Sequence, residues 1–141
     1  MSKKTLTIEY DYEFALFGLI CQEKDYRLCH EVNKKLKLGL KKEKDLAINL
    51  GRQKEVSSFS FYTAQGGDGL NYYTYHLFSN RSSRGLLIPE QKQIDFFIMV
   101  VGEIPAHEKK ELLLALKDIP IVMGTYELQP KELKSKENLI F

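Results

Sequence analysis

The stretch Ile94-Asp95-Phe96-Phe97-Ile98-Met99-Val100-Val101 decides the fold class, because residues 96–101 form the longest apolar run of the chain. A membrane-spanning helix needs ~20 apolar residues, so this run is too short to be one. A strand that is apolar on both faces is typically covered on both faces by other parts of the protein. We therefore expect residues 94–101 to form a central strand of a sheet.

Helical periodicity appears in one segment before this strand and in one segment after it. The apolar residues of the first are Leu28, Cys29, Val32 and Leu36, and those of the second are Leu112, Leu113 and Leu116. The first helix is expected to begin at Asp25 and to end near Gly39. The second is expected to begin at Pro105, since proline suits the first turn of a helix, and to reach Lys117.

Other segments show the patterns of strands and turns. Alternating polar and apolar residues predict strands at 6–10 and 45–50, and apolar stretches predict strands at 14–21 and 119–126. Two β-rich segments flank Gly66-Gly67-Asp68-Gly69, which predicts a hairpin because glycine adopts the positive φ values of tight turns. Residues 41–44 are interpreted as a charged connector, and residues 80–85 as a polar loop.

This order of elements predicts an α+β fold, with one mostly antiparallel sheet and two amphipathic helices packed on it. The chain has 141 residues, a length typical of one domain. We expect residues 1–128 to form that single domain. Residues 129–141 are expected to form a polar tail with an apolar C-terminal anchor.

The composition excludes a protein that attracts nucleic acid through its overall charge. The 21 basic and 19 acidic residues give a net charge of +2, so such binding has to come from a local patch. Glu9, Asp11 and Glu13 interrupt the apolar residues near the start, and we expect no secretion signal. A soluble, cytoplasmic protein without a membrane partner is expected.

The cysteines and histidines do not form a typical metal-binding pattern. Cys21 and Cys29 are too far apart in sequence and have too few neighbouring ligands, so both are expected to be free, buried thiols. His30, His76 and His107 lie in three different predicted elements, which favours structural or solvated roles. We therefore expect no metal and no other cofactor.

A motif beside the central strand resembles that of a known family. Ile88-Pro89-Glu90 is followed by three residues and then by Ile94-Asp95-Phe96. This arrangement resembles the motif of the bacterial IPExxVDY family, with one additional residue in the spacer, Ile in place of Val and Phe in place of Tyr. The resemblance extends over nearly the whole chain and implies a bacterial protein, but it assigns no catalytic residue.

The two carboxylates of this motif, Glu90 and Asp95, allow a catalytic interpretation, because paired carboxylates perform general acid/base chemistry in many enzymes. Glu90 follows Pro89, and Asp95 lies at the start of a strand. Carboxylates in such positions commonly accept backbone hydrogen bonds. We favour this structural role over a catalytic one.

The loop after the second β-rich segment contains a candidate anion site, formed by Asn80, Arg81, Ser82 and Arg84. Arginine offers a planar set of donors to a phosphate or carboxylate. The loop lacks the spacing of a phosphate-binding loop, and the glycines at 66–69 match neither a P-loop nor a dinucleotide motif. A loop stabilised by its own side-chain hydrogen bonds is the favoured alternative.

Lysines are concentrated at residues 34–44, where Lys34, Lys35, Lys41 and Lys42 are candidate partner-binding residues. Such a cluster could bind RNA phosphates or an acidic protein. The favoured alternative is a solvated helix end, where positive charge complements the helix dipole.

The tail places three large apolar side chains, Leu139, Ile140 and Phe141, after a lysine-rich stretch. Leaving each of them in water forgoes roughly 1.5–3 kcal/mol. We therefore expect them to dock, either on their own domain or across an interface with a second copy or another protein. These residues are thus also candidate partner-binding residues.

No stretch of the sequence has the specificity of a catalytic signature. The leading hypothesis is therefore a small, non-enzymatic binding or regulatory module that acts through protein–protein contacts, with another protein or in a homodimer. One alternative is an RNA-associated protein that uses the lysines at 34–44. Another is an enzyme with an anion site near Arg81 and Arg84.

Overall fold

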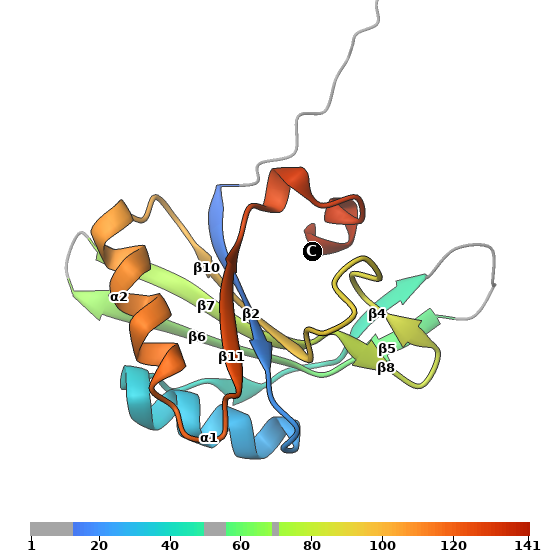
Figure 1. The fold of residues 1–141 in the computed structure, drawn as a ribbon, viewed down its shortest axis with the longest axis horizontal. Coiled ribbons are helices and arrows are strands. Elements are labelled where there is room, and N and C mark those ends of the chain that lie inside the picture. Colours follow the sequence, from blue (N-terminus) through green and yellow to red (C-terminus); the bar gives the residue numbers. More distant parts are fainter. Residues whose placement is uncertain (1–12, 50–55, 69–70) are drawn as a thin grey trace, which may run out of the picture.

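The apolar run predicted to be a central strand forms β10, Phe96–Val101, in the computed structural model (Figure 1). The structure describes residues 13–49, 56–68 and 71–141. β10 lies between β2, Phe14–Ile20, and β7, Asn71–Ser79, and is antiparallel to both. All residues of β10 except Val101 are buried, which confirms that the central strand is covered on both faces.

The main sheet has six strands in the order β11-β2-β10-β7-β6-β3, and each strand is antiparallel to its neighbours. The remaining strands of this sheet are β11 (Gly124–Leu128), β6 (Phe61–Asp68) and β3 (Lys41–Lys42). β6 and β7 form a hairpin as predicted, but Gly66, Gly67 and Asp68 belong to strand β6 and pair with β7 instead of forming the turn. Two short ribbons lie apart from the sheet, made of β4 (Leu46–Asn49) with β5 (Val56–Phe59) and of β8 (Arg81–Ser82) with β9 (Gly85–Leu86).

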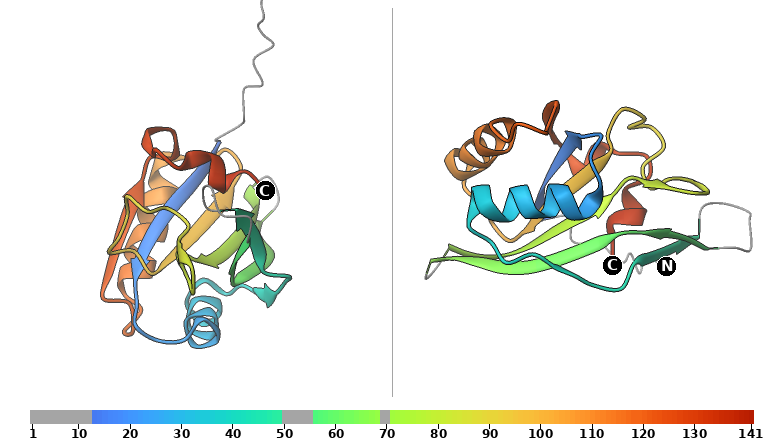
Figure 2. Two further views of the ribbon diagram at one scale, coloured as in Figure 1. Left: turned by 90° about the vertical axis from the view of Figure 1, so that its right-hand side faces the viewer. Right: turned by 90° about the horizontal axis from the view of Figure 1, so that it is seen from below.

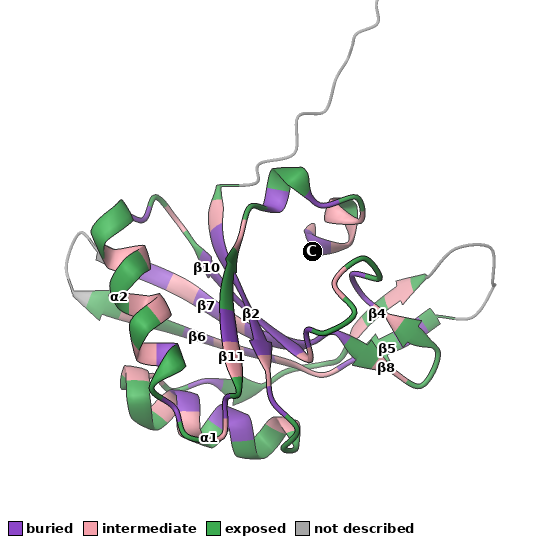
Figure 3. Ribbon diagram, viewed as in Figure 1, coloured by how far each residue is buried: buried purple, intermediate pink, exposed green. Residues whose placement is uncertain are grey.

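Both helices lie on one face of the sheet (Figures 1 and 2). They are α1, Asp25–Leu36, and α2, Ala106–Lys117, and Figure 3 marks their buried residues in purple. The helix-side core between them and the sheet includes Phe17, Leu19, Leu28, Val32, Tyr73, Tyr75, Leu77, Ile98, Val100 and Leu116. No helix in the described part of the chain is long and apolar enough to cross a membrane.

The opposite face of the sheet carries a second core, the tail-side core, which contains Leu16, Phe59, Phe78, Leu87, Ile88, Ile94, Phe97, Met99, Leu133 and Leu139. Residues 87–94 contribute to it from outside the sheet, as do Leu133, directly after the short 3-10 helix η1 (Pro130–Glu132), and Leu139 of a second one, η2 (Lys136–Leu139). Gly18 permits this packing, since a Cβ there would lie 2.7 Å from Cδ1 of Ile94. The predicted α+β fold with one mostly antiparallel sheet is therefore confirmed.

Two predicted strands have different positions in the structure. The strand predicted at 119–126 begins only at Gly124, because Pro120 has no N–H to donate to a strand ladder and lies in a turn. The strand predicted at 45–50 forms β4 but pairs with β5, outside the main sheet. The strand predicted at 6–10 lies outside the described residues.

The segment between the first helix and β4 also differs from the prediction. α1 ends at Leu36 rather than near Gly39, because Lys37 adopts a left-handed conformation with a φ of 57°, which stops the helix. Residues 41–44 are more than a connector, since Lys41 and Lys42 pair with β6 as strand β3.

Cys21 and Cys29 are both buried, and neither forms a disulfide, which confirms the prediction of free thiols. Burial raises the pKa of each thiol. Both therefore stay protonated at neutral pH and serve as small apolar groups in the helix-side core.

Candidate functional site

Asn80 organises the loop that carries the IPE motif. Its side chain is fully buried. The Nδ2 group donates to the carbonyl oxygens of Gln91 at 3.0 Å and Ile94 at 2.9 Å, and Oδ1 accepts from the N–H of Ile88 at 2.7 Å. Both donors and the acceptor of this amide are thus engaged inside the loop, and the side chain does not face a ligand.

Asp95 joins three segments of the chain. One carboxylate oxygen accepts a hydrogen bond from Nε of Arg81 at 2.6 Å, and the other accepts from the N–H of Cys21 at 2.8 Å. Arg81 also donates to the carbonyl of Lys92 at 2.7 Å. This arrangement gives Asp95 a structural role at the start of β10 and supplies Arg81 with a counter-charge.

The other two residues of the predicted anion site stabilise the β8–β9 turn. The Ser82 hydroxyl donates to the carbonyl of Gly85 at 2.9 Å and accepts from the N–H of Arg84 at 3.2 Å. A hollow of about 240 Å³ beside Arg81 is lined by two carboxylates, those of Glu23 and Asp95. The four residues lie in one segment, but the charge around Arg81 does not favour an anion.

Glu90 connects the IPE motif to the tail through hydrogen bonds with Ser135. Its two carboxylate oxygens accept hydrogen bonds from the N–H of Ser135 at 2.7 Å and from the Ser135 hydroxyl at 2.9 Å. Burial acts to raise the pKa of Glu90, but these hydrogen bonds outweigh it and leave the pKa below its usual value. Glu90 and Asp95 are thus bound to different partners, and the geometry does not arrange them as an acid/base pair.

The end of the tail packs on its own domain in this structure. Asn138 donates to the carbonyl of Leu87 at 2.8 Å, and Leu139 is buried in the tail-side core. Ile140 is half-buried. The Phe141 ring remains half-exposed, but its centroid lies 5.3 Å from that of Phe61 in an edge-on arrangement.

His76 of β7 lies beside this aromatic contact. Its ring stacks on Phe61 with a centroid distance of 5.0 Å, and its Nδ1 is 2.7 Å from the hydroxyl of Thr63. Burial lowers the pKa of His76. The imidazole is therefore neutral at pH 7 and forms part of the surface that Phe141 covers.

The predicted lysine cluster is largely neutralised by carboxylates. Lys34 pairs with Glu31, Lys35 with Asp118, and Lys42 with both Asp25 and Asp45. The Lys42 ammonium also lies 5.1 Å from the ring centroid of Tyr62. Acidic groups interspersed in this way weaken the attraction that a phosphate backbone needs.

The two edges of the main sheet differ in their protection against pairing with other chains. An exposed edge strand is a template for foreign strands, and proteins commonly prevent pairing with short edge strands and lysines. The β3 edge has both features, since Lys41–Lys42 is only two residues long and both lysines are exposed. Beyond β3, the outer edge of β6 contains Gly66 and Gly67, which disfavour regular pairing.

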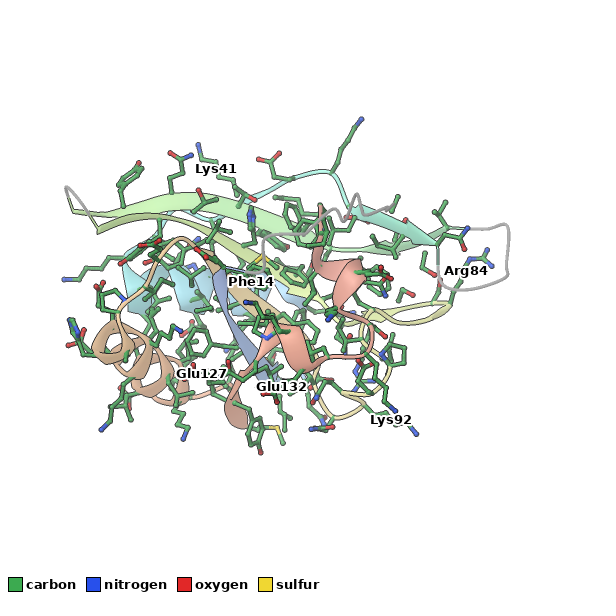
Figure 4. The ribbon with its side chains drawn as sticks, turned by 90° about the horizontal axis from the view of Figure 1, so that it is seen from above. Phe14, Lys41, Arg84, Lys92, Glu127 and Glu132 are labelled. Carbon is green, nitrogen blue, oxygen red and sulfur yellow. The ribbon has the colours of Figure 1, made fainter. Side chains whose placement is uncertain are left out.

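The other edge is β11, called here the β11 edge, and it lacks this protection. Its five residues, Gly124-Thr125-Tyr126-Glu127-Leu128, contain no lysine and no proline. Only β2 pairs with β11 among the described residues. Met123, directly before β11, and Tyr126 expose 68% and 49% of their surface, so two large apolar side chains lie at a strand whose outer edge is unpaired among the described residues. Figure 4 shows Glu127 of this edge and Lys41 of the protected edge on opposite sides of the molecule.

Thr125 adds a polar feature to the β11 edge. Its side chain is buried, and Thr125 Oγ1 is the one buried side-chain nitrogen or oxygen without a hydrogen-bond partner in the described ranges. Leaving such a group unsatisfied costs about 1–3 kcal/mol. A hydrogen-bond partner for this hydroxyl would therefore stabilise the protein.

The sequence pattern does not single out Met123, Thr125 or Tyr126 as site residues. Local patterns identify strands, whereas the order of the strands decides which of them is an edge. The absence of lysine and proline from residues 124–128 is the one local signal, and it becomes informative only when the edge position is known.

A hollow of about 730 Å³ opens near the end of β11, between the first turn of α2 and η1. Its charged lining residues are Glu13, Glu103, Lys109, Lys131 and Glu132, which carry charges of both signs. In the described segments, no three His, Cys, Asp or Glu side chains are grouped closely enough to hold a metal ion.

Comparison with known proteins gave no match to a family model, to a curated protein or to a solved structure. The resemblance to the IPExxVDY family remains a prediction from the motif residues.

Proposed function

We propose that this protein is a small, non-enzymatic bacterial binding or regulatory module that acts by adding a strand of a protein partner to its β11 edge. The observation that carries the proposal is the β11 edge, whose outer side has no partner strand among the described residues and beside which Met123 and Tyr126 are exposed. The bacterial origin rests on the motif resemblance alone.

Strand addition suits this edge for a physical reason. Backbone N–H and C=O groups on the outer side of β11 pair with an extended partner segment, which supplies affinity, and side chains on alternate faces supply specificity. Fully burying a side chain such as Met123 or Tyr126 stabilises a complex by roughly 1.5–3 kcal/mol relative to leaving it exposed.

The lysines at 34–44 also support strand addition at β11, because two of them form the opposite edge of the main sheet. Lys41 and Lys42 make up the short β3 edge, and their charges oppose the approach of another strand there. These lysines thus prevent pairing at the β3 edge, so that strand addition takes place at β11. The RNA-binding alternative has less support, because Lys34, Lys35 and Lys42 have carboxylate partners.

The enzyme alternative also has less support from the geometry. Asn80 is engaged by the backbone of its own loop, and Arg81 is paired with Asp95. An anion site at these residues would need to displace contacts that hold the IPE motif in place.

A selection of extended peptides displayed on phage, with the purified chain as target, tests the proposal. We expect binders that slow amide hydrogen exchange at residues 124–128. Their affinity should fall on the order of tenfold or more in Tyr126→Lys, because the charge opposes a neighbouring strand. Tyr72→Lys is the matched control, since Tyr72 is 57% exposed but lies on the inner strand β7. Binders that protect other segments, or that bind Tyr126→Lys as well as the unchanged chain, would contradict strand addition at β11.

A further inference from the structure

We infer that the strand added to the β11 edge is β11 of a second copy of this chain, paired antiparallel about a two-fold axis at Tyr126. This inference rests on the proposed function and specifies its partner. It explains the unsatisfied hydroxyl of Thr125 and the absence of protecting residues together.

The side-chain directions in β11 follow from its register with β2. Thr125 and Glu127 lie opposite Leu19 and Phe17, which both belong to the helix-side core. Gly124, Tyr126 and Leu128 therefore lie on the other face, because side chains alternate along a strand. Directly opposed residues of an antiparallel pair share a face, so a symmetric pair must keep this alternation.

A two-fold axis at Tyr126 sets Thr125 of one copy opposite Glu127 of the other. Cβ atoms of directly opposed residues lie about 4.5–5.5 Å apart, which is within reach of a hydrogen bond between short side chains. The Thr125 hydroxyl, after rotation about its χ1 angle where needed, donates to the Glu127 carboxylate of the second copy. A hydrogen bond to a charged acceptor is stronger than a neutral one, and the symmetry forms it twice.

The opposite face of the paired strands is complementary as well. Tyr126 lies opposite Tyr126 of the second copy, and aromatic pairs stabilise neighbouring strands. Leu128 lies opposite Gly124, which has no side chain of its own to exclude it. The exposed Tyr126 ring thereby packs against the Tyr126 ring of the second copy.

Neighbouring symmetric registers lack this complementarity. A shift by two residues in one direction places Glu127 opposite Glu127, and like charges directly opposed destabilise a strand pair. The opposite shift places Thr125 opposite Thr125 and sets the Glu127 carboxylate against the apolar side chain of Met123. Only the register centred on Tyr126 gives both Thr125 and Glu127 a suitable partner.

Sedimentation velocity of the full chain over a concentration series tests the association. The unchanged chain should show a monomer–dimer equilibrium, and Tyr126→Lys should weaken the dimer on the order of tenfold or more. Tyr72→Lys should leave it unchanged. A chain that stays monomeric at its highest soluble concentration overturns self-pairing, as does a dimer that Tyr126→Lys does not weaken.

Disulfide trapping tests the register. Tyr126→Cys should form a covalent dimer by itself under mild oxidation, because position 126 faces its own copy. Thr125→Cys and Glu127→Cys should each form no covalent dimer alone but should form a covalent heterodimer when mixed. The unchanged chain is the control, since its own cysteines are buried. Trapping by Thr125→Cys alone, or no trapping at position 126, overturns the register.

Failure of this inference differs from failure of the proposed function. If the chain is monomeric but selected peptides slow hydrogen exchange at residues 124–128, the edge binds a foreign strand and self-pairing alone is wrong. If neither a second copy nor a peptide protects these residues, both are wrong.

Discussion

Glu90 accepts two hydrogen bonds from Ser135, one from the backbone N–H and one from the hydroxyl, although the two residues are 45 positions apart in the chain. The contact connects the IPE motif to the tail. The carboxylate of the motif therefore has an architectural role, since it fixes the segment that supplies Leu133 and Leu139 to the tail-side core.

Ser135→Ala removes the hydroxyl contact to Glu90 and should lower the free energy of unfolding by about 0.5–1.5 kcal/mol near pH 7. Because the folded-state pKa of Glu90 lies below its ordinary value of 4.5, this contribution is present above that pH and is lost as the pH falls below it. Urea unfolding of both proteins above and below that pH measures the difference. The exposed Ser83, replaced by Ala, is the control. A difference that is the same at both pH values would mean that the ionised Glu90 is not the partner.

Asn80→Ala should destabilise the fold by about 3 kcal/mol or more, because it leaves the N–H of Ile88 and two loop carbonyls without partners. Asn49→Ala is the matched control, since Asn49 is exposed on β4. Urea denaturation of the two variants measures the contrast. Equal and small effects would show that Asn80 does not organise residues 88–94.

Gly18→Ala should cost about 1–3 kcal/mol, because its new methyl group would overlap Ile94, whose Cδ1 lies 2.7 Å from that position. The control is Gly39→Ala, where nothing lies within 4 Å and no destabilisation of comparable size is expected. Replacing Ile94 with Val in the Gly18→Ala background should recover part of the loss. If the double variant is as unstable as the sum of the two single variants, the two side chains do not compete for one space.

Lowering the pH from about 7.5 to about 5.5 should destabilise the protein through His76. Burial holds the folded-state pKa of His76 below its ordinary 6.5, so the neutral ring contributes stability above that pH, and the contribution is lost as the pH falls below it. Thermal unfolding of the unchanged chain and of His76→Gln measures this. The variant should lose less stability over the same range, since the exposed His30 and His107 are common to both. An identical pH dependence would contradict the role of His76.

The fold was predictable where one local pattern dominates. The strand predicted at 94–101 forms β10 from Phe96 to Val101, and the helix predicted from Asp25 to near Gly39 forms α1, which ends at Leu36. The apolar pattern thus predicted both elements, although not their exact bounds. The pairing of strands that are distant in the chain could not be predicted from local patterns. Nothing local in Lys41–Lys42 predicts that it pairs with Tyr62 and Thr63, and nothing local in residues 45–50 predicts a ribbon outside the sheet.

The candidate site shows the same division between local and long-range information. Their residue types make four residues candidates in the sequence, namely Asn80, Arg81, Glu90 and Asp95. In the structure, these side chains form hydrogen bonds between segments that are distant in the chain. The β11 edge depends on strand order, which the sequence pattern alone does not reveal. Thr125 becomes notable only through the absence of a partner for its hydroxyl.

The central claim is that the β11 edge pairs with another strand, and amide hydrogen exchange at residues 124–128 measures this most directly. The account predicts that those of these amides that point away from β2 are protected in a concentrated solution of the unchanged chain and lose protection on dilution and in Tyr126→Lys. The amides of β10, which is paired on both sides within one chain, should stay protected throughout. Exchange at residues 124–128 that is independent of concentration, of added selected peptide and of Tyr126→Lys would contradict the account.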